Sequence, residues 1–162
     1  RLSTFLRHTL ASDPKEQVTL AQELEAIDLY LQIQKVRFGE RLTYEFEVSP
    51  EARTGCVPSL ILQPLVENTV KYAVAPQQEG GRVEIIAMRQ GPHLVVEVRD
   101  TGPGVPDPEV LTVQGTGVGL ANCRARLREF YGPDARLSLI NLEPHGLCVR
   151  IEIPYQEGPY NE

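Results

Sequence analysis

The sequence predicts an α+β fold, a two-layer α/β sandwich in which helices cover one face of a mixed, mostly antiparallel sheet, after a helical leader. Two observations carry this prediction. Segments with alternating apolar residues, typical of strands, are interleaved with segments whose apolar residues recur every three or four positions, typical of helices. The last strands are joined by short turns, as in antiparallel sheets. With 162 residues, of which 41% are hydrophobic, the chain can bury a core.

The first 40 residues are expected to form the helical leader. Apolar side chains keep a helical spacing over residues 2–10, and Ser12-Asp13-Pro14 interrupts the pattern. A longer helix is predicted over residues 19–38, where apolar residues again fall three or four apart. Thr19 and Gln22 are spaced as a capping box, and Gly39 stands where a helix usually ends.

Residues 41–155 are expected to form the main domain, followed by a polar tail over residues 156–162 that we expect to fray. Pro64 lies inside one of its predicted helices and either kinks that helix or marks its first turn. The predicted helices cover residues 57–73 and 119–131, and the predicted strands cover residues 42–48, 82–89, 93–99, 136–142 and 147–153.

Charge and cysteine content exclude several classes of protein. The net charge of −6 leaves no basic surplus for phosphate neutralisation, so we expect no nucleic-acid partner. The three cysteines lack the spacing of a disulfide framework or a zinc site. No apolar run reaches the length of a membrane span. The chain opens in the middle of an apolar pattern, so we expect it to be a piece of a longer protein whose upstream part could hold a membrane anchor.

The first of three polar clusters comprises Glu67, Asn68, Lys71 and Tyr72 within a predicted helix. Asn68, Lys71 and Tyr72 are expected on one face of that helix. An amide oxygen suits Mg²⁺, a lysine suits phosphate and a tyrosine can stack on a base. Taken alone, the cluster is better explained as the exposed surface of an amphipathic helix, because short motifs match by chance.

The second cluster places Asp100 at the end of a predicted strand, before a turn that contains Gly102 and Gly104. An aspartate there can simply cap the turn. The functional interpretation is an acceptor for the exocyclic amine of adenine, with the two glycines allowing a ligand to approach the backbone.

The third cluster runs from Gly115 through Thr116, Gly117, Val118 and Gly119 to Leu120, where a helix is predicted to start. Free amides at a helix start form a phosphate cradle. No strand directly precedes the glycines, which excludes the dinucleotide fingerprint, and no Lys-Ser or Lys-Thr follows, which excludes a P-loop. A flexible hinge remains the alternative.

In this order the clusters resemble the histidine-kinase branch of the ATPase superfamily shared with gyrase, the heat-shock chaperones and the mismatch-repair ATPases. The likeness is greatest to LytS-type sensor histidine kinases and covers nearly the whole chain. It rests on residues 62–68 with Lys71, on residues 100–104, on residues 115–120 with Asn122, and on residues 30–38. Two departures are Thr69 and Tyr72, where that family usually has Ala and His.

The resemblance implies ATP and Mg²⁺ as cofactors, with Asn68 as the metal ligand and Asp100 reading adenine. Gyrase-type enzymes place a catalytic Glu one turn before the metal Asn, where this chain has Pro64. Glu67 is therefore our candidate for orienting the nucleophile. The implied nucleotide-binding residues are Asn68, Lys71, Tyr72, Asp100, Gly102, Gly104, Gly115, Thr116, Gly117, Val118, Gly119 and Leu120.

The resemblance also implies a function. The fold would be of the histidine-kinase ATPase type, and residues 1–40 would end a dimerisation and phosphoacceptor region. The γ-phosphoryl of ATP would pass to a histidine upstream of this chain and then to an aspartate of a response regulator. The parent would be a homodimer, and this chain the cytoplasmic domain of a membrane-anchored sensor. His8, His93 and His145 lack the neighbours that the family places around its acceptor.

Two other classes stay open from the sequence. One is a kinase of the anti-sigma type that phosphorylates serine, or a dimer-gated ATPase. The other is a non-catalytic module that binds ATP only to change shape.

Overall fold

The computed structural model describes residues 16–108 and 117–158, so the helix predicted over residues 2–10 lies outside the described residues. At the centre is a five-stranded sheet in the order β2-β4-β5-β7-β6. β2 and β4 run parallel and the other neighbouring pairs are antiparallel, which confirms the predicted mixed sheet. The strands are β2 (Leu42–Val48), β4 (Gly81–Gln90), β5 (His93–Asp100), β6 (Arg136–Asn141) and β7 (Leu147–Pro154).

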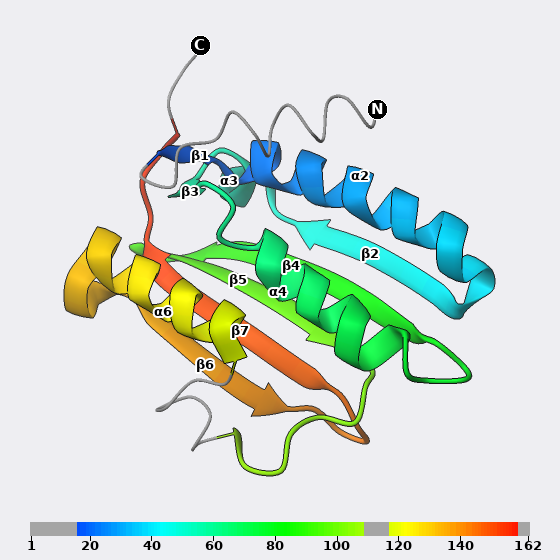
Figure 1. Ribbon diagram of the computed structural model, residues 1–162. Helices are drawn as coiled ribbons and strands as arrows, with labels where there is room; N and C mark the ends of the chain where they lie inside the picture. The colour runs from blue at the N-terminus through cyan, green and yellow to red at the C-terminus, as the bar shows by residue number, and fades with distance from the viewer. Residues whose placement is uncertain (1–15, 109–116, 159–162) are drawn as a thin grey trace.

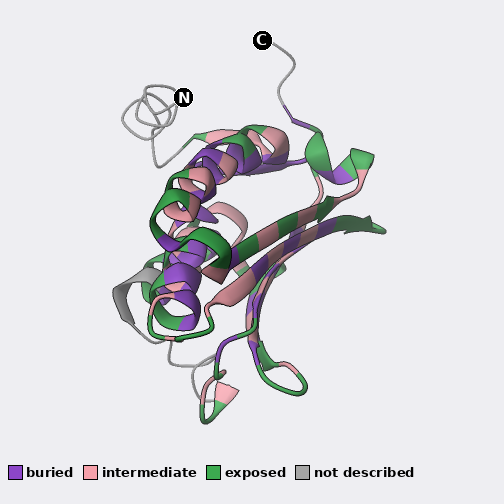
Figure 2. Ribbon diagram, turned by 90° about the vertical axis from the view of Figure 1, so that its right-hand side faces the viewer, coloured by how far each residue is buried: buried purple, intermediate pink, exposed green. Residues whose placement is uncertain are grey.

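The main helices all lie on one face of this sheet, which gives the predicted two-layer α+β sandwich (Figures 1 and 2). Within the described ranges, no helix is both long and apolar enough to cross a membrane. The helices are α2 (Leu20–Phe38), α4 (Gln63–Thr69), which continues into the π-helix η2 (Val70–Val74), and α6 (Gly117–Tyr131), with short turns at α3 (Pro50–Arg53), η1 (Gly39–Arg41) and η3 (Gly132–Asp134).

Helix α2 confirms its predicted ends. Thr19 Oγ1 accepts a hydrogen bond from the Gln22 N–H at 3.2 Å, and Gln22 Oε1 accepts one from the Thr19 N–H at 3.0 Å. This reciprocal pair is the capping box expected from the spacing. At the other end Gly39 has φ +60°, which glycine adopts without steric penalty. The buried side of α2 packs on the core through Leu24, Ile27 and Leu31 among others.

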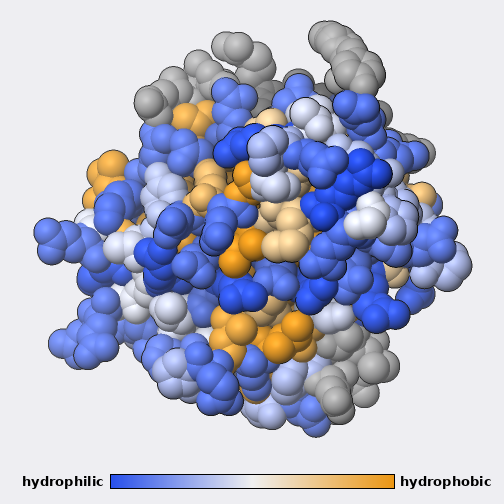
Figure 3. All heavy atoms as spheres, turned by 180° about the vertical axis from the view of Figure 1, so that it is seen from behind, coloured by the Kyte–Doolittle hydropathy of each residue, from blue (hydrophilic) through white to orange (hydrophobic). Residues whose placement is uncertain are grey.

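The core lies between the sheet and the helices because the strands alternate. Val83, Ile85 and Ala87 of β4 are buried in the core cluster together with buried residues of α2, α4 and α6. The other sheet face carries ion pairs instead, such as Arg99 with Glu97 at 2.8 Å. Figure 3, which views the molecule from behind, shows a mostly hydrophilic surface with smaller apolar areas. The helices therefore cover only one face of the sheet.

A second, two-stranded sheet was not expected. β1 (Gln17–Thr19) pairs antiparallel with β3 (Cys56–Pro58). The last described residues join it: Gly55 forms a bridge with Glu157, and the Cys56 N–H donates to the carbonyl of Gln156 at 2.8 Å. The expectation of a frayed tail is thus wrong for residues 156–158, because backbone hydrogen bonds hold them. Residues 159–162 lie outside the described part.

The helix predicted over residues 57–73 is wrong at its start. Residues 56–58 form β3, a turn follows, and α4 begins only at Gln63. Leu60 in that turn has φ +61°, which no right-handed helix contains. Of the two roles considered for Pro64, the structure shows the first helical turn, where its missing N–H is not needed. The apolar residues before Gln63 are buried by tertiary packing, and their spacing in the sequence happened to match that of a helix.

Candidate functional site

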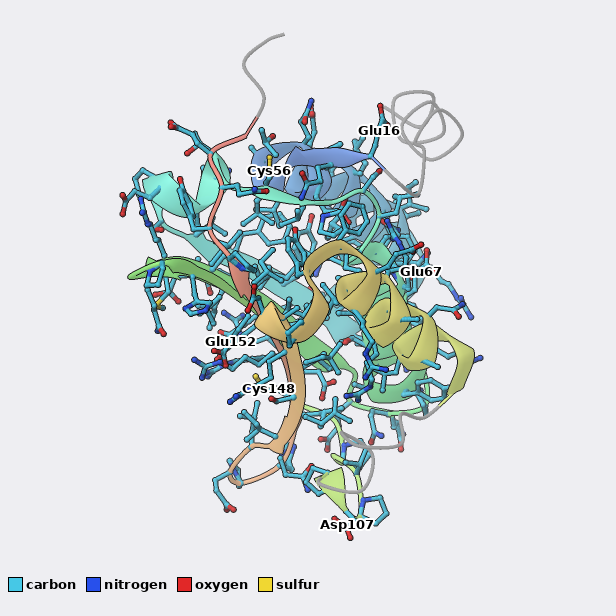
Figure 4. The ribbon with its side chains drawn as sticks, turned by 90° about the vertical axis from the view of Figure 1, so that its left-hand side faces the viewer. Glu16, Cys56, Glu67, Asp107, Cys148 and Glu152 are labelled. Atoms are coloured by element: carbon cyan, nitrogen blue, oxygen red, sulfur yellow. The ribbon has the colours of Figure 1, made fainter. Side chains whose placement is uncertain are left out.

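The first polar cluster lies on α4 and η2. Glu67 is exposed and accepts a hydrogen bond from Gln63 Nε2 at 3.2 Å, across one helical turn. Burial, and after it the negative charge of Glu67, raises the pKa of Tyr30 in α2 to about 12, so this hydroxyl stays protonated near Glu67. Figure 4 shows Glu67 on the helical side of the molecule. Glu67 is thus an ionisable, accessible carboxylate with a fixed neighbour.

Asn68, the candidate metal ligand, is half-buried one residue further along. Its side-chain amide has no hydrogen-bond partner among the residues that the structure describes. Lys71 and Tyr72 are exposed on the following turn, with Lys71 Nζ 5.2 Å from the centre of the Tyr72 ring. An amide oxygen, an ammonium group and an aromatic ring therefore remain available to a ligand beside this helix.

The helix changes from α to π geometry just after Asn68. The Ala75 N–H donates to the carbonyl of Val70 at 2.9 Å, five residues earlier. π turns inside α-helices are rare and often occur at functional sites. The end of this helix is held from outside, because the Arg41 guanidinium donates to the carbonyls of Ala75 at 3.2 Å and Gln77 at 2.7 Å. Nothing in the sequence indicated the π turn.

Asp100, the candidate base-reading acid, ends β5 and is only 9% exposed. Its Oδ1 accepts two backbone hydrogen bonds, from Gly102 at 2.8 Å and from Leu147 at 3.1 Å. Burial raises the pKa of Asp100 above its ordinary 3.8, and the two N–H donors act in the opposite direction. Since both donors use the same oxygen, Oδ2 has no partner among the described residues and is the atom left for a ligand.

A close backbone contact joins the first two clusters. Gly102 lies against η2, and a Cβ at this glycine would come within 2.7 Å of the Cβ of Ala73. Gly104 has φ +77°, and a Cβ there would meet Asn141 Oδ1 at 2.5 Å. Both glycines are therefore required by packing, whether or not a ligand approaches them. The contact places the turn after Asp100 directly beside the helix that carries Asn68.

The end of β6 and the turn that follows it form hydrogen bonds with the segment after Asp100. Asn141 Oδ1 accepts from the Val105 N–H at 3.0 Å, and Asn141 Nδ2 donates to the Val105 carbonyl at 2.8 Å. His145 Nδ1 lies 2.7 Å from the Thr101 carbonyl. Asp100 is therefore held by a preformed frame of backbone and side-chain hydrogen bonds.

The glycine cluster is described only in part. Gly115 and Thr116 lie outside the described residues, and α6 starts at Gly117, two residues before the predicted start. Gly117, Val118, Gly119 and Leu120 form the first turn of α6, whose N–H groups have no partner inside the helix. The side chain of Leu120 is buried in the core, so only its backbone can face a ligand. α6 contacts α4, which brings this helix start toward the same side of the sheet.

Sequence reasoning missed three residues that shape the site. Gln63 was detectable, because it precedes Glu67 by four residues and side chains at this spacing meet on a helix. Ala73 and the Leu147 N–H gave no signal, since their importance depends on contacts across the fold. The surface also has a hollow of about 940 Å³ beyond the Thr101–Pro103 turn, lined by Arg41, Gly80 and His145 among others, but neither Asn68 nor Asp100 lines it.

The raised pKa of Asp100 predicts a pH dependence of stability. A carboxyl whose pKa is higher in the folded state favours folding when protonated, and this contribution is lost as the pH rises through the folded-state pKa. Asp100→Asn keeps an oxygen for both backbone donors but never ionises. We compare the free energy of unfolding of Asp100→Asn with that of the unsubstituted chain in urea titrations. The value for Asp100→Asn minus the value for the unsubstituted chain should rise between about pH 3 and pH 7.

Asp134→Asn is the matched control, because Asp134 is exposed in η3, the short turn after α6. A pH-dependent difference for Asp100→Asn no larger than that for Asp134→Asn would contradict the burial argument.

Comparisons with known proteins show the family of the chain. A family model described as histidine kinase-, DNA gyrase B- and HSP90-like ATPase matches residues 58–157, which include the described site residues, and a model described as histidine kinase matches residues 1–42. The sensor histidine kinase BtsS of Escherichia coli K12 is 38% identical over 157 residues, covering 96% of this chain and 27% of BtsS. The sensor protein LytS of Enterococcus faecalis is 31% identical, covering 97% of this chain and 28% of LytS.

Solved structures show the same fold. The catalytic domain of the histidine kinase ThkA superposes with a TM-score of 0.69 at 20% identity, covering 88% of this chain and 97% of that domain. ThkA in its complex with the response regulator TrrA superposes with a TM-score of 0.65 at 21% identity, over 96% of this chain and 48% of ThkA. The chain spans less than a third of the length of the curated relatives BtsS and LytS. From the family match over residues 58–157, more than half of its length, the chain belongs to the family of histidine kinase-, DNA gyrase B- and HSP90-like ATPases.

Proposed function

We propose that this chain is the ATP-binding catalytic domain of a sensor histidine kinase. The observation that carries the proposal is Asp100, a buried carboxylate with one oxygen held by two backbone amides and the other left for a ligand. It lies beside the helix that bears Asn68, through the contact of Gly102 with Ala73. The relative BtsS is named as a sensor histidine kinase, which supports phosphoryl transfer rather than plain hydrolysis.

In this proposal Asp100 reads adenine. Oδ2 accepts a hydrogen bond from the exocyclic amine at the 6-position of the base. Guanine has a carbonyl oxygen at that position, so an ionised carboxylate would face another acceptor. The two N–H groups on Oδ1 fix the carboxylate plane, and this fixed orientation reduces the entropy lost on binding.

The residues present fit a magnesium ion that is shared with ATP. Mg²⁺ takes one or two protein oxygens and completes its octahedron with phosphate and water. Asn68 offers such an oxygen on a half-buried side chain. Within residues 16–108 and 117–158 no cluster of three or more His, Cys, Asp or Glu side chains could hold a metal by itself. Bound there, the ion would neutralise charge on the transferring phosphoryl group.

The remaining site residues position the phosphates of ATP and the acceptor histidine. The amides at the start of α6, with Gly115 and Thr116 before them, would hold the phosphates, and Lys71 would add a positive charge. Glu67, oriented by Gln63, would accept a hydrogen bond from one imidazole nitrogen of the acceptor histidine. The other nitrogen is then directed at the γ-phosphorus, and the chain's contribution is mainly positioning.

The architecture of the parent protein follows from the same proposal. Residues 1–40 would end the dimerisation and phosphoacceptor region, residues 41–155 would form the catalytic domain, and residues 156–162 the tail. The parent would be a homodimer that passes its phosphoryl group to a response regulator. Any membrane attachment would come through segments upstream of this chain, with this domain in the cytoplasm.

Incubation of the full-length parent with Mg²⁺ and γ-labelled ATP tests the proposal. We expect label that is stable in base and labile in acid, as a phosphorylated imidazole is, and its loss in Asn68→Ala. Acid-stable label would instead show a serine kinase of the anti-sigma type. Release of phosphate without label would show a dimer-gated ATPase, and the absence of both would show a non-catalytic sensor of ATP.

Base preference is the second test, measured by calorimetry on this chain. The unsubstituted chain should bind ATP at least about fivefold more tightly than GTP, since one unmatched buried acceptor costs about 1–3 kcal/mol. Asp100→Asn should lose most of this preference, because an amide nitrogen in place of Oδ2 can donate to the guanine carbonyl. Asp134→Asn should retain it. Equal affinity of the parent for ATP and GTP would remove Asp100 from its assigned role.

A further inference from the structure

A buried carboxylate from α2 holds the turn that starts the candidate site helix. Glu23 is only 1% exposed although it is charged. Its Oε1 accepts the N–H of Leu60 at 2.9 Å, and its Oε2 accepts the N–H of Leu62 at 3.0 Å. Leu62 immediately precedes α4, so Glu23 occupies both oxygens on the backbone from which that helix begins.

The turn does not stabilise itself. Leu62 is the N-cap of α4, and no side chain of the turn caps the helix. Ser59, which is fully buried, has no partner for its hydroxyl oxygen among the described residues. Leu60 has φ +61°, a conformation that is sterically unfavourable for a residue with a Cβ. The backbone path into α4 is therefore strained and uncapped, and Glu23 supplies the missing acceptors.

The electrostatics of this contact favour a carboxylate at position 23 over a neutral amide. The N–H of Leu62, the N-cap of α4, has no partner inside the helix, and the helix dipole places partial positive charge at this end. A carboxylate at this point is stabilised, and its negative charge is matched by the groups it touches. A neutral amide would meet one N–H with its own N–H, because each carboxylate oxygen already accepts one donor.

We infer that Glu23 is a positioning residue for the metal-binding end of the site, acting through the start of α4. The inference rests on the proposed function, because Asn68 must bind Mg-ATP for its position to matter. Asn68 lies five residues after Gln63, the first residue of α4, so the rotation and tilt of the first turn set where its amide points. Asp100 on β5 is held by its own backbone frame and does not depend on Glu23.

Glu23→Gln tests this inference, with Glu25→Gln as the matched control. Glu25 lies on the same helix but is exposed, so the same chemical change there leaves the turn intact. We expect Glu23→Gln to weaken Mg-ATP binding about ten- to a hundredfold, the effect of one lost buried hydrogen bond to a charged acceptor. ATP affinity in EDTA, and the ratio of ATP to GTP affinity, should change less than about twofold on the same free-energy scale. Glu25→Gln should match the parent in every measurement.

The outcomes separate this inference from the proposed function. A parent chain that does not bind Mg-ATP overturns the proposed function itself. A parent that binds, with Glu23→Gln binding Mg-ATP equally well, overturns the inference alone. An equal loss with Mg²⁺ and in EDTA also overturns it, because that is the behaviour of a residue needed only for folding.

Circular dichroism establishes that each variant is folded before titration. If Glu23→Gln does not fold, Glu23→Asp takes its place, since it keeps the charge but is too short to reach both N–H groups. The same outcomes then apply to Glu23→Asp.

Discussion

The arrangement of the candidate site depends on one close contact, that of Gly102 with Ala73. A Cβ at position 102 would come within 2.7 Å of the Ala73 Cβ, so only a glycine lets β5 end this near the π-helix. The contact places the turn after Asp100 beside the helix that carries Asn68, although the two residues are more than thirty positions apart in the chain. If the end of β5 moved away, these two candidate ligand-binding residues would be separated.

Two buried carboxylates serve this arrangement in different ways. Asp100 uses a single oxygen for both of its backbone donors, which frees the other oxygen for recognition. Glu23 uses one oxygen for each donor, so both of its oxygens contact the backbone at the start of α4. The hydrogen-bond pattern thus distinguishes a carboxylate with one oxygen left for a ligand from one whose two oxygens both hold the backbone, although both lie in the protein interior.

Much of the fold could be predicted because local pattern and tertiary packing agree. Helix α2 begins and ends where its capping box and Gly39 indicate, and the strands of the main sheet follow the alternation of apolar residues. The start of α4 could not be predicted, since its turn is fixed by Glu23, 37 residues before Leu60 in the sequence. The β1–β3 sheet and the π turn likewise depend on contacts that no short window of sequence contains.

For the site, the sequence located Asp100 at a strand end and Asn68 on a helix, and the structure places both there. It could not show which oxygen of Asp100 is free, because the Leu147 donor comes from β7, across the sheet. Nor could it show that the side chain of Leu120 is buried in the core, so that only its backbone could face a ligand. The sequence shows which side chains are present. The hydrogen-bond partner of each polar atom can be identified only once the fold is known.

The most direct test is the NMR response of the labelled chain to a non-hydrolysable Mg-ATP analogue. If the nucleotide lies between α4 and the end of β5, the largest shifts should fall on the side-chain amide of Asn68 and on the backbone amide of Leu147. Shifts confined to the hollow lined by Arg41 and Gly80, with those two amides unmoved, would contradict the account.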